Sequence, residues 1–79
     1  MEREEILNKL TGIFRSIFND QNLEIGDDLT ANDVENWDSL THMLLISEVE
    51  SNFSVKFKLK ELNKMHNVGD MVNFIQEKI

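Results

Sequence analysis

The chain has 79 residues and no cysteine, so it is long enough for one small domain and has neither disulfides nor thiolate metal sites to stabilise it. Its 15 acidic residues outnumber its 8 Lys and Arg, and the net charge of −7 disfavours nucleic acid and anionic lipid as partners and favours basic protein surfaces. Residues 1–5 lack the basic start and apolar stretch of a signal peptide and no apolar run could span a bilayer, so we expect a cytoplasmic monomer, outside the membrane, with a single domain over residues 1–79.

Apolar residues at helical spacing predict a first helix from about residue 3 to residue 18. Its buried stripe is expected to consist of Ile6, Leu10, Ile13, Phe14 and Ile17. The next stretch, to Asp38, has scattered Asn, Asp and Gly without a sustained period, and an irregular connection of this length is unusual in a compact domain unless it is functional. Within it, the segment from Thr30 to Asp33 predicts a short capped turn.

The helical period returns at Ser39 and predicts a second helix from about residue 39 to residue 52, with Ser39 as its N-cap. The buried side of this helix is predicted to hold Met43, Leu45, Ile46, Val49 and Phe53. Residues 54–60 alternate in the manner of a strand, but a single strand would leave its backbone groups without partners. We therefore predict an extended loop there.

Two further helices are predicted in the last part of the chain. A short third helix is expected from Glu61 to His66, and Asn67 is expected to cap a fourth. The apolar positions of the fourth helix are Val68, Met71, Val72, Ile75 and Ile79. Proline is absent, which is typical of a helix bundle joined by irregular loops.

The most distinctive motif is the run from Trp37 to Leu40, which places the Ser39 hydroxyl beside the Asp38 carboxylate at the predicted start of a helix. A phosphodiester on Ser39 would lie where free N–H groups and the helix dipole favour an anion. Taken alone, a serine in this position is more often only a helix cap. The surrounding sequence therefore has to decide between the two interpretations.

The tripeptide from Asp38 to Leu40 resembles the attachment motif of acyl carrier proteins, and the similarity extends over most of the chain. It covers the first helix, the long loop with Asp28 and Leu29, the second helix as far as Phe53, and the last helix. The resemblance implies an all-α fold, a four-helix bundle with a short third helix and a long loop between helices one and two.

The same resemblance implies a cofactor and a function. Ser39 would carry 4′-phosphopantetheine, donated from coenzyme A by a phosphopantetheinyl transferase, with Asp38 and Leu40 completing the cofactor-binding motif. The thiol of this arm would hold an acyl group as a thioester, as in fatty acid biosynthesis, so the protein would be a carrier without catalytic activity of its own. A loading ligase and downstream transferases would be its partners.

The second helix departs from the usual pattern of that family, which is strongly acidic after the tripeptide. Here the acids come later, at Glu48 and Glu50. Leu40 and Leu44 are four residues apart and share a face away from the buried stripe, so we predict a docking surface of these two leucines flanked by the two acids. With Trp37 before the tripeptide, this pattern also fits an aminoacyl or peptidyl carrier of a specialised pathway. An unmodified acidic interaction module is a third alternative.

Other chemistry is less well supported by the sequence. His42 lies three residues after Ser39, but no G-x-S-x-G elbow and no third catalytic residue accompany the pair, so we interpret His42 as a surface or partner-contact residue. The acidic spacing from Asp20 resembles a calcium loop, yet Ile25 and Ala31 stand where glycine and glutamate are needed. We therefore predict no metal site. Partial burial is predicted for the Trp37 side chain.

Overall fold

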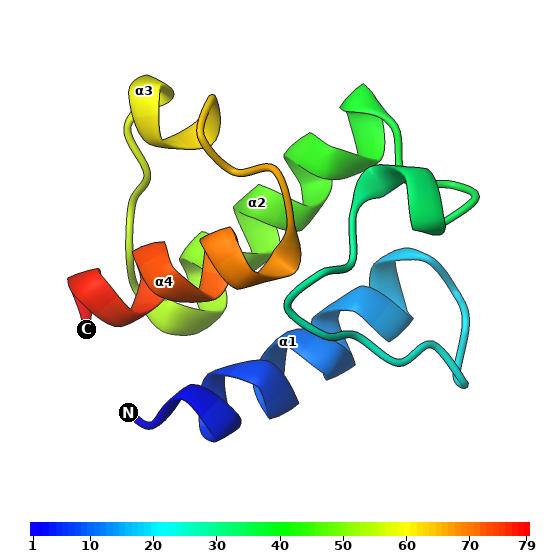
Figure 1. Ribbon diagram of the computed structural model, residues 1–79, viewed down its shortest axis with the longest axis horizontal. Helices are drawn as coiled ribbons and strands as arrows, with labels where there is room; N and C mark the ends of the chain where they lie inside the picture. Colours follow the sequence, from blue (N-terminus) through cyan, green and yellow to red (C-terminus); the bar gives the residue numbers. More distant parts are fainter.

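The computed structural model describes all residues 1–79 and contains only helices and loops. The elements are α1 (Arg3–Ile17), the 3-10 turn η1 (Ala31–Asp33), α2 (Ser39–Phe53), α3 (Leu59–Leu62) and α4 (Val68–Lys78). Helix α1 packs against both α2 and α4, and the two chain ends lie at the same end of the bundle (Figure 1). The predicted all-α fold with a short third helix and a long first loop is confirmed. None of these helices combines the length and the apolar character that crossing a membrane requires.

One core of 16 buried apolar side chains holds the bundle together. Helix α1 contributes Ile6, Leu10, Ile13 and Phe14, which confirms the predicted stripe except that Ile17 is only half-buried against the core. Helix α4 contributes Val68, Met71, Val72 and Ile75. Because the core consists of apolar side chains alone, burial of apolar surface is its main source of stability.

The buried face of α2 differs from the prediction in its first turn. Met43 is 57% exposed, so its predicted place in the core is wrong. A helix turns by about 100° per residue, so the face that holds Leu45, Ile46, Val49 and Phe53 includes position 42 and not position 43. His42 is therefore the residue that continues the core stripe toward the start of the helix.

The third helix lies earlier in the chain than expected. It spans Leu59–Leu62 and not the predicted range from Glu61 to His66. Its start is fixed by Glu61, whose Oε1 accepts a hydrogen bond from the Lys58 N–H at 2.7 Å, and the same carboxylate pairs with Lys78 of α4 at 3.0 Å. These two contacts are not visible in the apolar pattern, which explains the shift. The preceding extended loop is confirmed, although it is shorter than predicted.

Helix α4 begins as predicted, because the Asp70 N–H donates to Asn67 Oδ1 at 2.8 Å. Ile79 lies beyond its last turn and is 46% exposed, so its predicted place in the apolar repeat is wrong.

The long loop from residue 18 to residue 38 is fastened to the bundle at three places, the first of which is the Leu23 carbonyl, which accepts a hydrogen bond from Arg15 Nε of α1 at 2.8 Å. Near its middle, the N–H groups of Val68 and Gly69 donate to the carbonyls of Leu29 and Asp27 at 3.0 and 2.9 Å. The approach is close enough that a Cβ on Gly69 would lie 3.1 Å from Asp27 atoms. The predicted turn after Thr30 is confirmed as η1, and the loop ends with buried Val34 and Trp37. The loop is therefore ordered against α4 and the core before it reaches Ser39.

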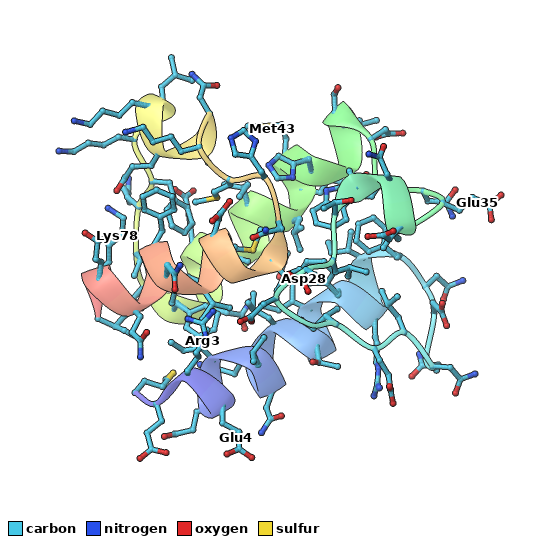
Figure 2. All side chains as sticks on the ribbon, in the orientation of Figure 1. Arg3, Glu4, Asp28, Glu35, Met43 and Lys78 are labelled. Carbon is cyan, nitrogen blue, oxygen red and sulfur yellow. The ribbon has the colours of Figure 1, made fainter.

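Charged side chains cover the outer surface of the bundle. Glu4 on α1 and Glu35 in the long loop project away from it, whereas Arg3 lies across the start of α1 (Figure 2). Arg3 pairs with Asp27 at 3.0 Å and donates to Asn73 at 2.6 Å. This residue therefore joins the chain start, the long loop and α4.

Candidate functional site

The start of α2 is closed by a reciprocal pair of hydrogen bonds. The Thr41 N–H donates to Asp38 Oδ1 at 2.9 Å, and the Asp38 N–H donates to Thr41 Oγ1 at 2.8 Å. Asp38 is therefore the N-cap, and the prediction that Ser39 caps the helix is wrong. The hydrogen bond from the Thr41 N–H is the main reason that the pKa of the Asp38 carboxyl lies below its usual value, so this exposed group is ionised at neutral pH.

Because Asp38 is the N-cap, Ser39 has no role in capping the helix. It is the first residue of α2 and is exposed, and the cap is completed by its neighbours. Its side chain lies at the edge of a cavity. An exposed primary hydroxyl at a helix N-terminus, where N–H groups and the dipole favour an anion, fits the covalent attachment of a phosphodiester.

Trp37 holds the residues before Ser39 in place. Its side chain is 9% exposed, which is more buried than predicted. The indole packs edge-on against Phe14 at 5.3 Å between ring centroids and lies 5.9 Å from Phe18. Because Phe14 lies in the last part of α1 and Phe18 is its C-cap, this aromatic cluster fixes the end of the long loop to the first helix.

His42 was predicted to be a surface or partner-contact residue, but it is half-buried against Trp37. The Trp37 Nε1–H donates to His42 Nδ1 at 3.0 Å, and the two rings are nearly parallel, with an interplanar angle of 19°. Burial lowers the pKa of His42 below its ordinary value, so the imidazole is neutral at neutral pH. The spacing of three, four and seven residues to Leu45, Ile46 and Val49 was the sequence signal for this position.

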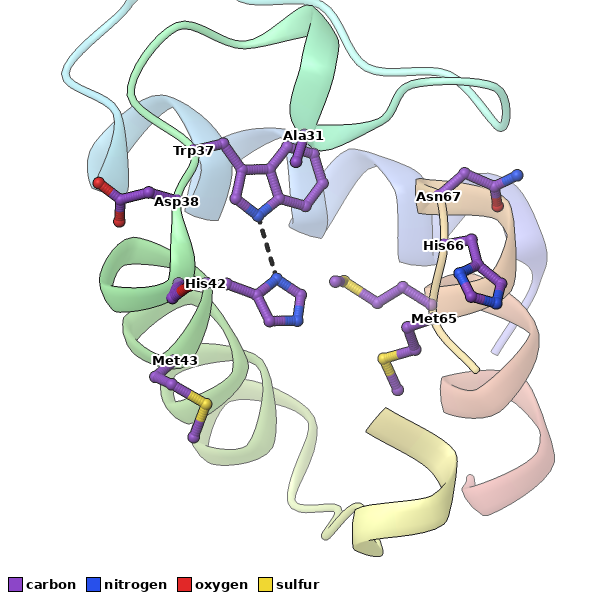
Figure 3. A pocket seen from close by; sticks show the side chains of 10 residues that line it. Ala31, Trp37, Asp38, His42, Met43, Met65, His66 and Asn67 are labelled. Carbon is purple, nitrogen blue, oxygen red and sulfur yellow. Dashed lines mark hydrogen bonds between the residues drawn. The ribbon is translucent and has the colours of Figure 1, made fainter. Parts of the chain in front are cut away.

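A cavity of about 470 Å³ opens beside Ser39. Figure 3 shows Trp37 and His42 on one side and the segment with Met65 and His66 on the other. The walls are mixed, with apolar surface from an indole and three methionines, and polar groups at the rim. The lining residues are Ala31, Trp37, Asp38, Ser39, His42, Met43, Met65, His66, Asn67 and Met71.

The residues predicted to bind partners lie on the outside of α2. Leu40 is 73% exposed and Leu44 is 53% exposed, so both are accessible, as the docking hypothesis requires. Glu48 is also exposed. Glu50 differs, because it is half-buried and its Oε2 accepts a hydrogen bond from the Phe57 N–H at 2.9 Å. Glu50 thus also holds the loop between α2 and α3.

The acidic residues of the long loop are not gathered into a cluster. No group of three or more His, Asp or Glu side chains is placed to hold a metal ion. At the segment whose spacing resembles a calcium loop, Asp20 Oδ1 accepts a hydrogen bond from the Asn22 N–H at 3.0 Å and so closes a local turn.

Comparisons with known proteins agree with the geometry. No protein-family model matches the chain. It is 31% identical over 77 residues to an acyl carrier protein of Thermotoga maritima, a match that covers 98% of this chain and 95% of that protein. Its structure is similar to the solution structure of a holo acyl carrier protein from Geobacter metallireducens, with a TM-score of 0.87, 43% identity, and coverage of 91% of this chain and 83% of the other. The chain belongs to the acyl carrier protein family.

Proposed function

We propose that the protein holds an acyl group as a thioester on a 4′-phosphopantetheine arm attached to Ser39 and presents it to partner enzymes. The observation that carries this proposal is the Ser39 hydroxyl, which is exposed at the first position of α2 while Asp38 and Thr41 complete the cap. A carrier needs an attachment group that can be modified without loss of the fold, and Ser39 meets this condition.

Attachment requires one bond to form and one to break. The Ser39 oxygen bonds to the phosphorus next to the pantetheine of coenzyme A, the pyrophosphate link breaks, and the nucleotide half leaves while the transferase accepts the serine proton. When bound, the arm supplies the thiol that forms the thioester. The chain contains no cysteine, so no thiol of the protein competes with it for the acyl group.

Partner enzymes would bind to the outer face of α2. Leu40 and Leu44 offer exposed apolar contacts beside Ser39, and Glu48 provides negative charge further along the helix, whereas Glu50 is half-buried and bound to the Phe57 N–H. The net charge of −7 would attract the basic surfaces of a phosphopantetheinyl transferase, a loading ligase and downstream transferases. The protein itself would be a carrier and not an enzyme.

The attachment site is tested by intact mass after incubation with coenzyme A, magnesium and a broad-specificity phosphopantetheinyl transferase. Wild-type protein should gain the mass of one arm. Ser39→Ala should gain none and should still fold, because Ser39 is not the cap. Ser51→Ala, which changes another exposed serine of α2, is the matched control and should gain the arm. An arm added to the Ser39→Ala variant would overturn the assignment.

An aminoacyl or peptidyl carrier is the second candidate. It is favoured by the absence of acidic residues from the first turn of α2, where carriers of fatty acid synthesis are typically acidic. Loading of the modified protein with an amino acid by an adenylating ligase would distinguish the two candidates. A wild-type protein that never gains the arm would leave the third alternative, an unmodified acidic interaction module.

A further inference from the structure

The Trp37–His42 hydrogen bond fixes where the imidazole carries its proton. An indole N–H can only donate, so His42 Nδ1, 3.0 Å away, must be the unprotonated acceptor. The imidazole is neutral, because burial lowers the pKa of His42. Its single proton is therefore on Nε2, and His42 is a hydrogen-bond donor at that atom.

The Nε2–H group faces the cavity. Figure 3 shows the second ring nitrogen of His42 on the side away from Trp37, turned toward the space in front of Met65. The hydrogen bond from Trp37 occupies Nδ1, and the chain makes no second hydrogen bond to the His42 side chain. The wall opposite is formed largely by Met65 and Met71, whose thioethers are weak acceptors. The donor is thus directed into the cavity without a hydrogen-bond partner from the chain, since the acceptors Asp38, Ser39 and Asn67 that also line the cavity make no hydrogen bond to it.

The position of Ser39 brings a tethered group within reach of this donor. Ser39 and His42 are three residues apart on α2, and side chains at this spacing are neighbours on a helix, about 5–6 Å apart at Cβ. Both line the same cavity. A group attached to the Ser39 oxygen therefore starts at the cavity into which the Nε2–H points.

We propose that His42 Nε2–H is a binding site for an acceptor oxygen of the group tethered to Ser39. This inference rests on the proposed function. The oxygen belongs either to the arm, as a phosphodiester or amide oxygen, or to the cargo, as a carbonyl or hydroxyl close to the thioester. In both cases the Nε2–H group itself selects for an oxygen acceptor, because an ammonium would present donors to a donor. His42 is a positioning residue in this proposal, and Trp37 sets its tautomer.

The experiment follows the His42 side chain by NMR in protein with 15N-labelled imidazoles. Four forms are compared: unmodified protein, protein with the free arm, and protein loaded from butyryl and from 3-hydroxybutyryl coenzyme A. Intact mass first shows whether the arm is present, so failure to load is recognised separately and overturns both the proposed function and this inference.

A bound oxygen should shift the Nε2 resonance and slow exchange of its proton with water by up to roughly tenfold, the upper range for one net hydrogen bond. An effect already present with the free arm places the acceptor in the arm. An effect that is absent with the free arm but seen with both loaded forms places it at the carbonyl of the cargo, and an effect seen only with 3-hydroxybutyryl places it at the cargo hydroxyl. Loaded forms whose His42 signals and exchange rates all equal those of the unmodified protein overturn the inference.

Two variants separate the donor role from packing. Trp37→Phe keeps an aromatic ring in the cluster but removes the donor to Nδ1, so the imidazole can exchange tautomers and the protection of the Nε2 proton should fall. His66→Gln changes the other imidazole of the cavity wall, which is exposed, and should leave the His42 response unchanged. A response that survives Trp37→Phe undiminished would show that the indole does not set the tautomer.

Discussion

The two walls of the cavity are built in different ways. The wall from Trp37 to Met43 is anchored in the core through the aromatic cluster of Trp37, Phe14 and Phe18, and the reciprocal cap of Asp38 and Thr41 fixes its helix start. The opposite wall is formed by Met71 of α4, which is fully buried, and by the segment around α3, which has no fully buried side chain between Lys56 and Asn67. The first wall thus combines apolar burial with a cap, while the α3 segment of the second depends on partial burial and polar contacts.

Polar contacts hold the α3 segment of the second wall. The Glu61–Lys78 pair at 3.0 Å connects α3 to α4, and the His66 N–H donates to Asp70 Oδ2 at 3.0 Å. Leu59, the first residue of α3, is 74% exposed. Because segments with few buried apolar contacts open at low free-energy cost, we expect the α3 segment to open more easily than the first wall.

The largest difference between the walls should appear on truncation of their main apolar side chains. Trp37→Ala removes a buried indole and should lower the free energy of unfolding by about 3–5 kcal/mol, which in a domain this small is a large share of the total. Met65→Ala, the matched change in the half-buried α3 wall, should cost less, on the order of 1–2 kcal/mol. Urea unfolding measures both. Equal losses would show that the walls do not differ in burial energy.

The cap of the first wall gives the next largest effect. Asp38→Ala removes the side chain that accepts the Thr41 N–H, and its Tm should fall by several degrees. Asp38→Asn keeps an acceptor of the same shape and should stay near wild type, and Ser39→Ala should also stay near wild type because Ser39 is not the cap. Thermal unfolding by circular dichroism measures all three. A Ser39→Ala variant less stable than Asp38→Ala would return the cap to Ser39.

Apolar spacing predicts the structure correctly where local pattern alone decides it. The α1 stripe and the Asn67 cap of α4 follow from such patterns and are present. The cap of α2 does not follow from residue type, because both Asp38 and Ser39 are good N-caps. The reciprocal hydrogen bonds with Thr41 make Asp38 the cap. The resemblance of residues 38–40 to the attachment motif of acyl carrier proteins is visible in the sequence, whereas the choice of cap depends on the hydrogen bonds of Thr41.

The sequence prediction for His42 is wrong because a pattern of apolar residues does not include histidine. The spacing of His42 to Leu45 and Ile46 continues the buried stripe, whereas the apolar pattern predicts Met43 at this place. The position of α3 depends on Glu61 meeting Lys78, and no local pattern reveals a pair that is formed by tertiary packing. For the cavity, the signal in the sequence is His42, a polar residue that lies on the apolar stripe of α2.

A pH titration tests the His42 contact of the first wall. Burial lowers the pKa of His42 in the folded protein below its ordinary value of 6.5, so the contact stabilises the fold above that pH and its contribution is lost as the pH falls through the folded-state pKa. Protonation would also place a donor against the Trp37 Nε1–H. The charged or titratable groups lining the same cavity are Asp38 and His66. The free energy of unfolding should therefore decrease between pH 7 and pH 5.

The His42→Gln variant separates this effect from the other titrations. It keeps an acceptor for the indole but does not titrate, so its stability should change less over the same range, whereas His66→Gln should follow wild type. Denaturant unfolding at each pH gives the comparison. Identical pH profiles for wild type and His42→Gln would mean that the buried imidazole contributes nothing to the pH dependence.

The smallest expected effect comes from the screening of charge by salt. The segments at the two walls carry opposite charge, so that salt weakens both a repulsion and an attraction. The loop that leads to the first wall holds Asp27, Asp28, Asp33, Glu35 and Asp38, whereas Lys56, Lys58, Lys60 and Lys64, four of the 8 basic residues, lie at the second. Salt weakens the repulsion within the acidic loop and also the attraction between the walls, and exposed charges farther apart than about 8 Å are largely screened at 0.15 M ionic strength. With a net charge of −7, the repulsion should be stronger than the attraction, so the Tm should rise by a few degrees in sodium chloride and then level off.

Arg3→Gln, which removes the partner of Asp27, should show a larger rise, because wild type also loses the Arg3–Asp27 attraction on screening. Magnesium at matched ionic strength should give the same Tm as sodium. A Tm that falls with sodium chloride would show that attraction between the walls outweighs repulsion within the loop.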